Sequence, residues 1–128
     1  MYRDVTRGIQ IDVEPSFVPE ESHPKEEYFF FAYKVRITNV GKEATQLMSR
    51  HWIITDGHGE IHEVEGPGVI GQQPRLAPGE SFEYSSFCPL PTPTGNMRGR
   101  YWMVDATSGE RFAVRIPLFF LRDARSLH

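Results

Sequence analysis

The sequence has almost no cysteine, because its 128 residues include only Cys88. A single thiol cannot form an internal disulfide, which excludes the small secreted domains that disulfide bridges hold together. Cys88 lies beside Pro89, with no second thiol and no histidine nearby in the sequence. The sequence therefore predicts a protein of a reducing compartment, the cytoplasm.

Positive charge and long apolar runs are also scarce. The 14 Lys and Arg residues face 17 Asp and Glu residues, so the net charge is −3. This balance provides no overall basic surface, and we expect no binding to nucleic acid or to an anionic membrane. The N-terminus lacks the apolar stretch of a secretory signal, and no run approaches the ~20 apolar residues that span a bilayer. We therefore expect no signal peptide and no membrane segment.

Helical periodicity is missing, and apolar residues alternate with polar ones instead. Alternation is clearest over residues 28–39, where every odd position from Phe29 to Ile37 is apolar or aromatic. Successive side chains of a strand point to opposite faces, so this pattern predicts a strand with one face against a core. Further strands are predicted over residues 9–13, 44–56, 60–65, 81–85, 97–105 and 111–121. Large apolar residues occupy both odd and even positions of 44–56, so the sequence does not show which face of this strand is turned toward the core.

Turn-forming residues separate these predicted strands. The chain contains 11 Gly and 10 Pro, and loops are predicted at 15–25 and 89–96. Seven or eight short strands of this kind predict an all-β antiparallel sandwich of the immunoglobulin or fibronectin type III class, with a small barrel as the alternative. We expect one domain over residues 1–128, with a core over about 5–121 and a frayed tail over 122–128.

Five segments, in this order, resemble a known family. They are VRITNVG (35–41), RHWIITDG (50–57), GPGVIGQQP (66–74), LAPG (76–79) and GNMRGRY (95–101). Together they resemble the ApaG family, over roughly Val5 to Pro117. The resemblance implies a fibronectin-like sandwich that occurs alone in bacteria and as an interaction module in some eukaryotic F-box and polymerase-associated proteins. It implies no settled biochemical activity; the bacterial family is associated with divalent-cation (Co²⁺, Mg²⁺) tolerance and with a gene neighbour that hydrolyses diadenosine tetraphosphate.

A glycine-rich segment from Gly66 to Gly71 is the clearest functional feature. It matches the Gly-x-Gly-x-x-Gly fingerprint of dinucleotide-binding domains. That fingerprint requires a helix whose N-terminus points at pyrophosphate, and Pro74 and Pro78 fall where the helix would lie. We therefore reject a dinucleotide site of the Rossmann type.

Three interpretations of this segment remain open. The glycines can serve a turn that needs positive φ, or the loop can contact a partner protein. In the third, the amides of Gly68, Val69, Ile70 and Gly71 form a nest for pyrophosphate, ATP or diadenosine tetraphosphate. Arg75 could add positive charge to that nest.

Histidines and carboxylates gather around the predicted turn at 57–59. His58 lies in the turn, and Glu60 and His62 share one face of the following strand. Imidazole and carboxylate groups bind borderline divalent cations, so a Co²⁺ or Mg²⁺ site is one interpretation. Solvated turn residues are the alternative, and we expect no other cofactor.

Four consecutive apolar residues, Leu118, Phe119, Phe120 and Leu121, interrupt the alternation. They cannot all face one core. Either the N-terminal strand or the 15–25 loop covers their second face, or that face is an interface with a partner or a second copy. The sequence thus leaves a monomer and a homodimer open.

No catalytic residues are predicted, because Ser81 is not in a Gly-x-Ser-x-Gly elbow and Cys88 has no base nearby in the sequence. We expect a small, non-enzymatic binding module with an unidentified protein partner. Its loops at 66–71 and 89–96 would make the contact. The alternative is a binder of pyrophosphate or nucleotide anions.

Overall fold

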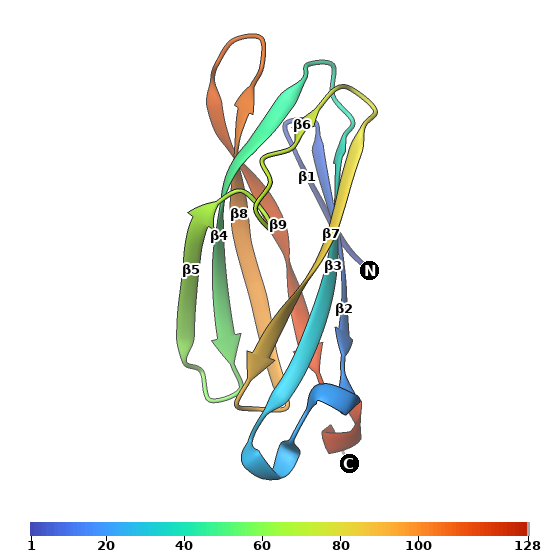
Figure 1. Cartoon of the computed structure of the whole chain (residues 1–128), viewed down its shortest axis with the longest axis vertical. Coiled ribbons are helices and arrows are strands. Elements are labelled where there is room, and N and C mark those ends of the chain that lie inside the picture. Colours follow the sequence, from blue (N-terminus) through green and yellow to red (C-terminus); the bar gives the residue numbers. More distant parts are fainter. Residues whose placement is uncertain (128) are drawn as a thin grey trace.

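Two antiparallel sheets pack face to face (Figure 1), which confirms the predicted all-β sandwich. The computed structural model describes residues 1–127, and the side chains of residues 1–125. Within this range one sheet has the strand order β1-β2-β3-β7 and the other β5-β4-β8-β9, with β6 paired to β4. The strands are β1 (Tyr2–Thr6), β2 (Ile9–Phe17), β3 (Phe29–Asn39), β4 (Thr45–Asp56), β5 (Ile61–Pro67), β6 (Arg75–Leu76), β7 (Ser81–Leu90), β8 (Thr94–Asp105) and β9 (Arg111–Arg122).

The core fills the space between the sheets and is centred on Trp52 of β4. Its indole ring makes edge contacts with Tyr33 at 5.3 Å and with Phe119 at 5.9 Å between ring centroids. Gly99 of β8 is paired with Trp52. A Cβ at Gly99 would lie 2.1 Å from the carbonyl oxygen of His51, so only glycine allows β8 to approach β4 this closely.

A β-bulge explains why the facing of residues 44–56 is ambiguous in the sequence. The pairing of β4 with β8 shifts register between Leu47 and Ser49. The extra residue reverses the parity of the strand, so that Leu47 before the bulge and Trp52 after it are both buried.

Prolines inside strands lie where no neighbouring strand needs their missing N–H. Val13 is the last residue of β2 that pairs with β1, and Pro15 lies in β2 after this point. Pro89 lies in β7, the outermost strand of its sheet. Pro117 lies at the register shift between β8 and β9. Strands therefore extend into the edges of the predicted loops at 15–25 and 89–96: β2 runs to Phe17, β7 runs to Leu90 and β8 begins at Thr94.

The structure describes residues 122–127 of the tail that the sequence predicts to be frayed, and residue 128 lies outside the described residues. The amide of Asp123 donates to the carbonyl of Pro93 at 2.8 Å, and Asp123 is buried. A short 3₁₀ helix, η3 (Ala124–Leu127), follows. The guanidinium of Arg125 lies 4.9 Å from the ring centre of Phe17.

Two other 3₁₀ turns, η1 (Pro19–Glu21) and η2 (Pro24–Glu26), lie between β2 and β3. Among the residues that the structure describes, no helix has the length and apolar character needed to cross a membrane.

Candidate functional site

The glycine-rich segment forms a tight turn that leads from β5 toward β6. Val69 and Gln72 exchange two backbone hydrogen bonds, at 2.8 and 2.9 Å. Ile70 and Gly71 between them have φ of 42° and 77°, and positive φ at both central positions is the pattern of a type I′ turn. No helix follows, as the two downstream prolines predict.

Arg50 of β4 holds this turn in place from inside the sandwich. Its Nη1 donates to the carbonyl oxygens of Pro67 at 3.0 Å and of Gly68 at 3.1 Å. Gly66 is paired with Arg50, and a Cβ at Gly66 would lie 3.0 Å from the same nitrogen. Sequence reasoning missed this role of Arg50, because no local pattern shows which face of β4 the side chain occupies.

A cleft of about 240 Å³ opens between the sheets beside this turn. Its walls come from β3 and β7 of one sheet, from β4, β5 and β8 of the other, and from the turn itself. The lining residues are Tyr33, Arg50, Trp52, Ile54, Val64, Val69, Ile70, Tyr84, Ser86, Phe87 and Met97. The cleft lies on the side where β5 and β7 are the outer strands of their sheets.

Neutral phenol groups and one guanidinium supply the polar chemistry of the cleft. Burial raises the pKa of Tyr33 and that of Tyr84, and the Tyr84 hydroxyl is hydrogen-bonded to the hydroxyl of Tyr101. Arg50 takes part in none of the ion pairs found among the described residues. The cleft thus combines an aromatic surface with a half-buried positive charge that no carboxylate balances.

Exposed apolar side chains surround the cleft. Ile70 of the turn is 57% exposed and Val64 of β5 is 42% exposed. Phe87, 61% exposed, lines the edge of the cleft from the outer face of β7, where its ring lies 5.3 Å from that of Phe30. They come from three separate segments, so the sequence alone does not show that they meet. Together with the cleft they form a concave apolar surface, which we call the cleft rim.

Two of the four amides of the predicted nest donate within the fold itself. The amide of Gly68 donates to the carbonyl of Met48 at 2.8 Å, and that of Val69 donates to Gln72. Arg75 is exposed in β6, outside the turn. Among the described residues, the amides of Ile70 and Gly71 donate no backbone hydrogen bond and would be available to an anion. Anion binding at this turn remains a prediction.

The carboxylates and histidines of the β4–β5 hairpin form a group that differs from the predicted one. Asp56, Glu60 and His62 each place a ligand atom within 4.8 Å of the others, whereas His58 is not a member. His58 instead donates its backbone amide to Asp56 Oδ1 at 2.8 Å. The predicted metal group of His58, Glu60 and His62 stays a prediction, and the structure places Asp56, rather than His58, beside Glu60 and His62.

With this geometry established, comparisons with known proteins place the chain in a family. The family model described as the ApaG domain matches residues 19–105. The chain belongs to the ApaG family. It is 57% identical to Protein ApaG of Methylobacterium sp. (strain 4-46) over 121 residues, covering 94% of this chain and 92% of that protein. It is 55% identical to Protein ApaG of Bdellovibrio bacteriovorus over 119 residues, covering 93% of each chain.

A solved ApaG-family structure agrees with the fold. The crystal structure of a Bordetella pertussis protein named ApaA superposes with a TM-score of 0.88 at 52% identity, covering 97% of each chain. The family resemblance of the five sequence segments is therefore confirmed. The cleft described above belongs to an ApaG-family sandwich.

The predicted apolar interface at the end of this ApaG-family domain is only half exposed. Phe119 and Leu121 lie in the core, with 0% and 1% exposure, whereas Leu118 and Phe120 are 46% and 47% exposed. Alternation in β9 resolves the run, because successive side chains of a strand face opposite sides. The prediction of an interface is thus wrong for Phe119 and Leu121, and it stays a prediction for the other two.

Proposed function

We propose that this chain is a cytoplasmic, non-enzymatic protein-interaction domain that receives a segment of its partner at the cleft rim. The rim is concave and apolar, with an aromatic floor, and such surfaces are typical of sites that bind side chains of a ligand or partner. The position of Ile70 is the single observation that carries this proposal.

Ile70 occupies a conformation that its side chain disfavours. A β-branched residue at φ 42° is sterically strained, at a cost of about 1–2 kcal/mol, and turns of this type favour Asn or Gly. The side chain gains little from burial, since it is more than half exposed. An exposed apolar group held in a strained turn is best explained by a partner that covers it.

Charge and hydrogen-bonding capacity indicate the kind of partner segment. Arg50 offers a guanidinium without a carboxylate, and a guanidinium pairs with carboxylates through planar donors. Tyr33 and Ser86 add uncharged hydroxyl groups. We expect a segment that places an apolar or aromatic side chain in the cleft and an acidic group near Arg50.

The ionisation states near the cleft support binding and not catalysis. Burial raises the pKa of the Cys88 thiol to about 11, so the thiol is protonated and a poor nucleophile at neutral pH. The raised pKa values of Tyr33 and Tyr84 keep both phenols uncharged under the same conditions. None of these groups is poised as a nucleophile or as a general base.

Replacement of Ile70 by Asn tests the proposal through two readouts. We expect Ile70→Asn to raise the free energy of unfolding by about 1 kcal/mol, because Asn tolerates positive φ. The same change should weaken binding of peptides selected from a random library against the unaltered protein by at least about tenfold, equivalent to ~1.4 kcal/mol. Urea unfolding and fluorescence anisotropy measure the two effects.

Ile61→Asn provides a matched control. Ile61 is 59% exposed on β5, is not among the residues that line the cleft and has no positive φ. Its replacement should neither stabilise the domain nor change peptide binding. Unchanged peptide affinity in Ile70→Asn would contradict the proposed function, and a loss of stability would contradict the strain at Ile70.

A further inference from the structure

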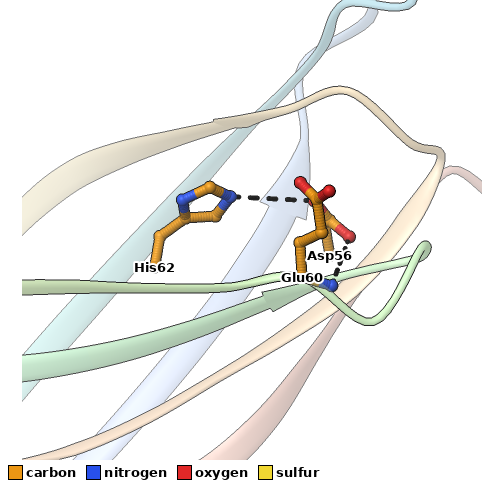
Figure 2. Close-up of side chains that lie close together, drawn as sticks. All are labelled: Asp56, Glu60 and His62. Atoms are coloured by element: carbon orange, nitrogen blue, oxygen red, sulfur yellow. Dashed lines mark hydrogen bonds and ion pairs between the residues drawn. The ribbon is translucent and has the colours of Figure 1, made fainter.

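The β4–β5 hairpin brings three metal-binding side chains together at its turn (Figure 2). Asp56 is the last residue of β4, and His62 is the second residue of β5. Pairing of Thr55 with Ile61 aligns the two strands, and Glu60 lies between them in the turn. One ligand atom from each of the three side chains lies within 4.8 Å of the others.

Asp56 carries the observation that points to a bound ion. Its carboxylate is fully buried. Its Oδ1 accepts hydrogen bonds from the backbone amides of His58 at 2.8 Å and Glu60 at 3.1 Å. Oδ2 has no hydrogen-bond partner. The Nε2 atom of His62 is 3.8 Å from Oδ2, too far for a hydrogen bond. A buried carboxylate oxygen without a hydrogen-bond partner is costly, and a cation would satisfy it.

The turn holds Asp56 in a fixed position. The amide of Gly57 donates to Thr92 Oγ1 at 2.7 Å, and the amide of Gly59 donates to the carbonyl of Asp56 at 3.0 Å. A Cβ at Gly57 would lie 2.9 Å from Thr92, so the β7–β8 loop also packs closely against the turn. The buried ligand is therefore preorganised.

Glu60 and His62 have the freedom to complete the site. Both side chains are exposed, and Figure 2 shows the imidazole directed at the Asp56 carboxylate. Metal bonds of about 2.1 Å place tetrahedral ligand atoms roughly 3.4 Å apart. Side-chain rotation of two exposed residues suffices to close the present spacing to that value.

We propose that Asp56, Glu60 and His62 bind a divalent first-row transition ion, with Zn²⁺ as the probe that best reports it. One imidazole and two carboxylates suit such an ion, whereas Mg²⁺ prefers six oxygen ligands in a strict octahedron. Three protein ligands leave one position for water or for a group of a bound molecule. The site is independent of the cleft rim and does not rest on the proposed function.

Titration of the intact protein with Zn²⁺, followed by calorimetry and by amide NMR, tests this site. We expect saturable binding of one ion, with the largest amide shifts over residues 56–62 and at Thr92. His62→Gln and Glu60→Gln should each weaken Zn²⁺ binding at least about tenfold. Mg²⁺ should bind at least about tenfold more weakly than Zn²⁺.

His58→Gln is the matched control, because His58 is an exposed histidine of the same turn that is not in the cluster. The Zn²⁺ affinity of His58→Gln should be within about twofold of that of the unaltered protein, as expected for a surface residue outside the site. The altered side chains are exposed, so amide spectra should show that all three variants keep the fold. The proposal is overturned by no saturable binding, by unchanged binding in His62→Gln, by lost binding in His58→Gln, or by equal Mg²⁺ affinity. It is also overturned by shifts centred on His51 of the same hairpin, whose ring nitrogens lie 2.7 Å from Glu63 and 3.1 Å from Glu65.

Discussion

At the scale of single residues, two glycines of the β5–β6 turn have similar backbones and different surroundings. Gly68 has φ 62°, and a Cβ there would lie 2.3 Å from the carbonyl oxygen of Gln72. Gly71 has φ 77°, and a Cβ there would meet no atom within 4 Å. The fold therefore needs glycine at Gly68 for space as well as for conformation.

This difference predicts unequal costs of adding one methyl group. Gly68→Ala should lower the free energy of unfolding by at least about 2 kcal/mol, because steric conflict adds to backbone strain. Gly71→Ala should lower the free energy of unfolding by only about 1 kcal/mol, the cost of backbone strain at positive φ. Urea unfolding of both variants measures the effect, and equal losses would contradict the role of Gly68 in holding the turn.

The sequence predicts single residues well where chemistry is local, and poorly where it depends on distant contacts. The glycine-rich segment stands out because glycine and proline restrict the backbone directly. The link between Arg50 and the turn joins residues 17 and 18 positions apart, and no sequence pattern specifies it. The sequence does not show that Asp56, rather than His58, lies beside Glu60 and His62, because side-chain direction in a tight turn depends on which backbone amides need an acceptor.

At the scale of elements, β9 shows how alternation survives within an apolar run. Phe119 is fully buried against Trp52 and Tyr33, whereas Phe120 beside it is about half exposed. The two phenylalanines thus differ only in the face of the strand that they occupy. Their contributions to stability should differ accordingly.

Alanine substitution at each position tests this assignment. Phe119→Ala should lower the free energy of unfolding by about 3–5 kcal/mol, because it leaves a cavity in the aromatic core. Phe120→Ala should cost less than about 1 kcal/mol, since its side chain is largely solvated. Chemical denaturation compares them, and a larger loss for Phe120→Ala would show that the register of β9 is wrong.

Most strands are predictable from the sequence, because their buried faces are apolar at every second position. The short strand β1 is an exception, because its apolar Val5 is exposed and the alternate positions are half-buried. On those alternate positions, Asp4 forms an ion pair with Arg115, and Thr6 accepts the Arg115 amide. Polar contacts therefore help to hold this strand beside the packing of Tyr2 on Phe119, and a hydrophobic pattern cannot reveal them.

At the scale of the whole molecule, exposed apolar groups gather in two separate places. One is the cleft rim, with Val64, Ile70 and Phe87, and the other is the outer face of β9, with Leu118 and Phe120. The two places are separate because β9 and β5 lie at opposite edges of their sheet. This strand order depends on long-range pairing that the sequence does not specify. The rim is the stronger binding surface because it is concave and contains the strained Ile70.

The cationic residues illustrate the same limit of sequence reasoning. Two pairs of alternating cationic residues lie in different sheets, with Arg98 and Arg100 on β8 and with Lys34 and Arg36 on β3. Lys34 and Arg36 face Glu83 of the neighbouring strand β7, at 3.1 and 3.9 Å. Such exposed pairs contribute little to stability.

Site-specific photo-crosslinking tests the central claim, that a protein partner binds at the cleft rim, most directly. A benzoylphenylalanine replaces Phe87 at the rim or Phe120 on the outer face of β9, both exposed phenylalanines, in cells that naturally contain the protein. The proposed function predicts a discrete protein adduct from position 87, lost when Ile70 is also changed to Asn, and none from position 120. An adduct from position 120 alone would contradict it.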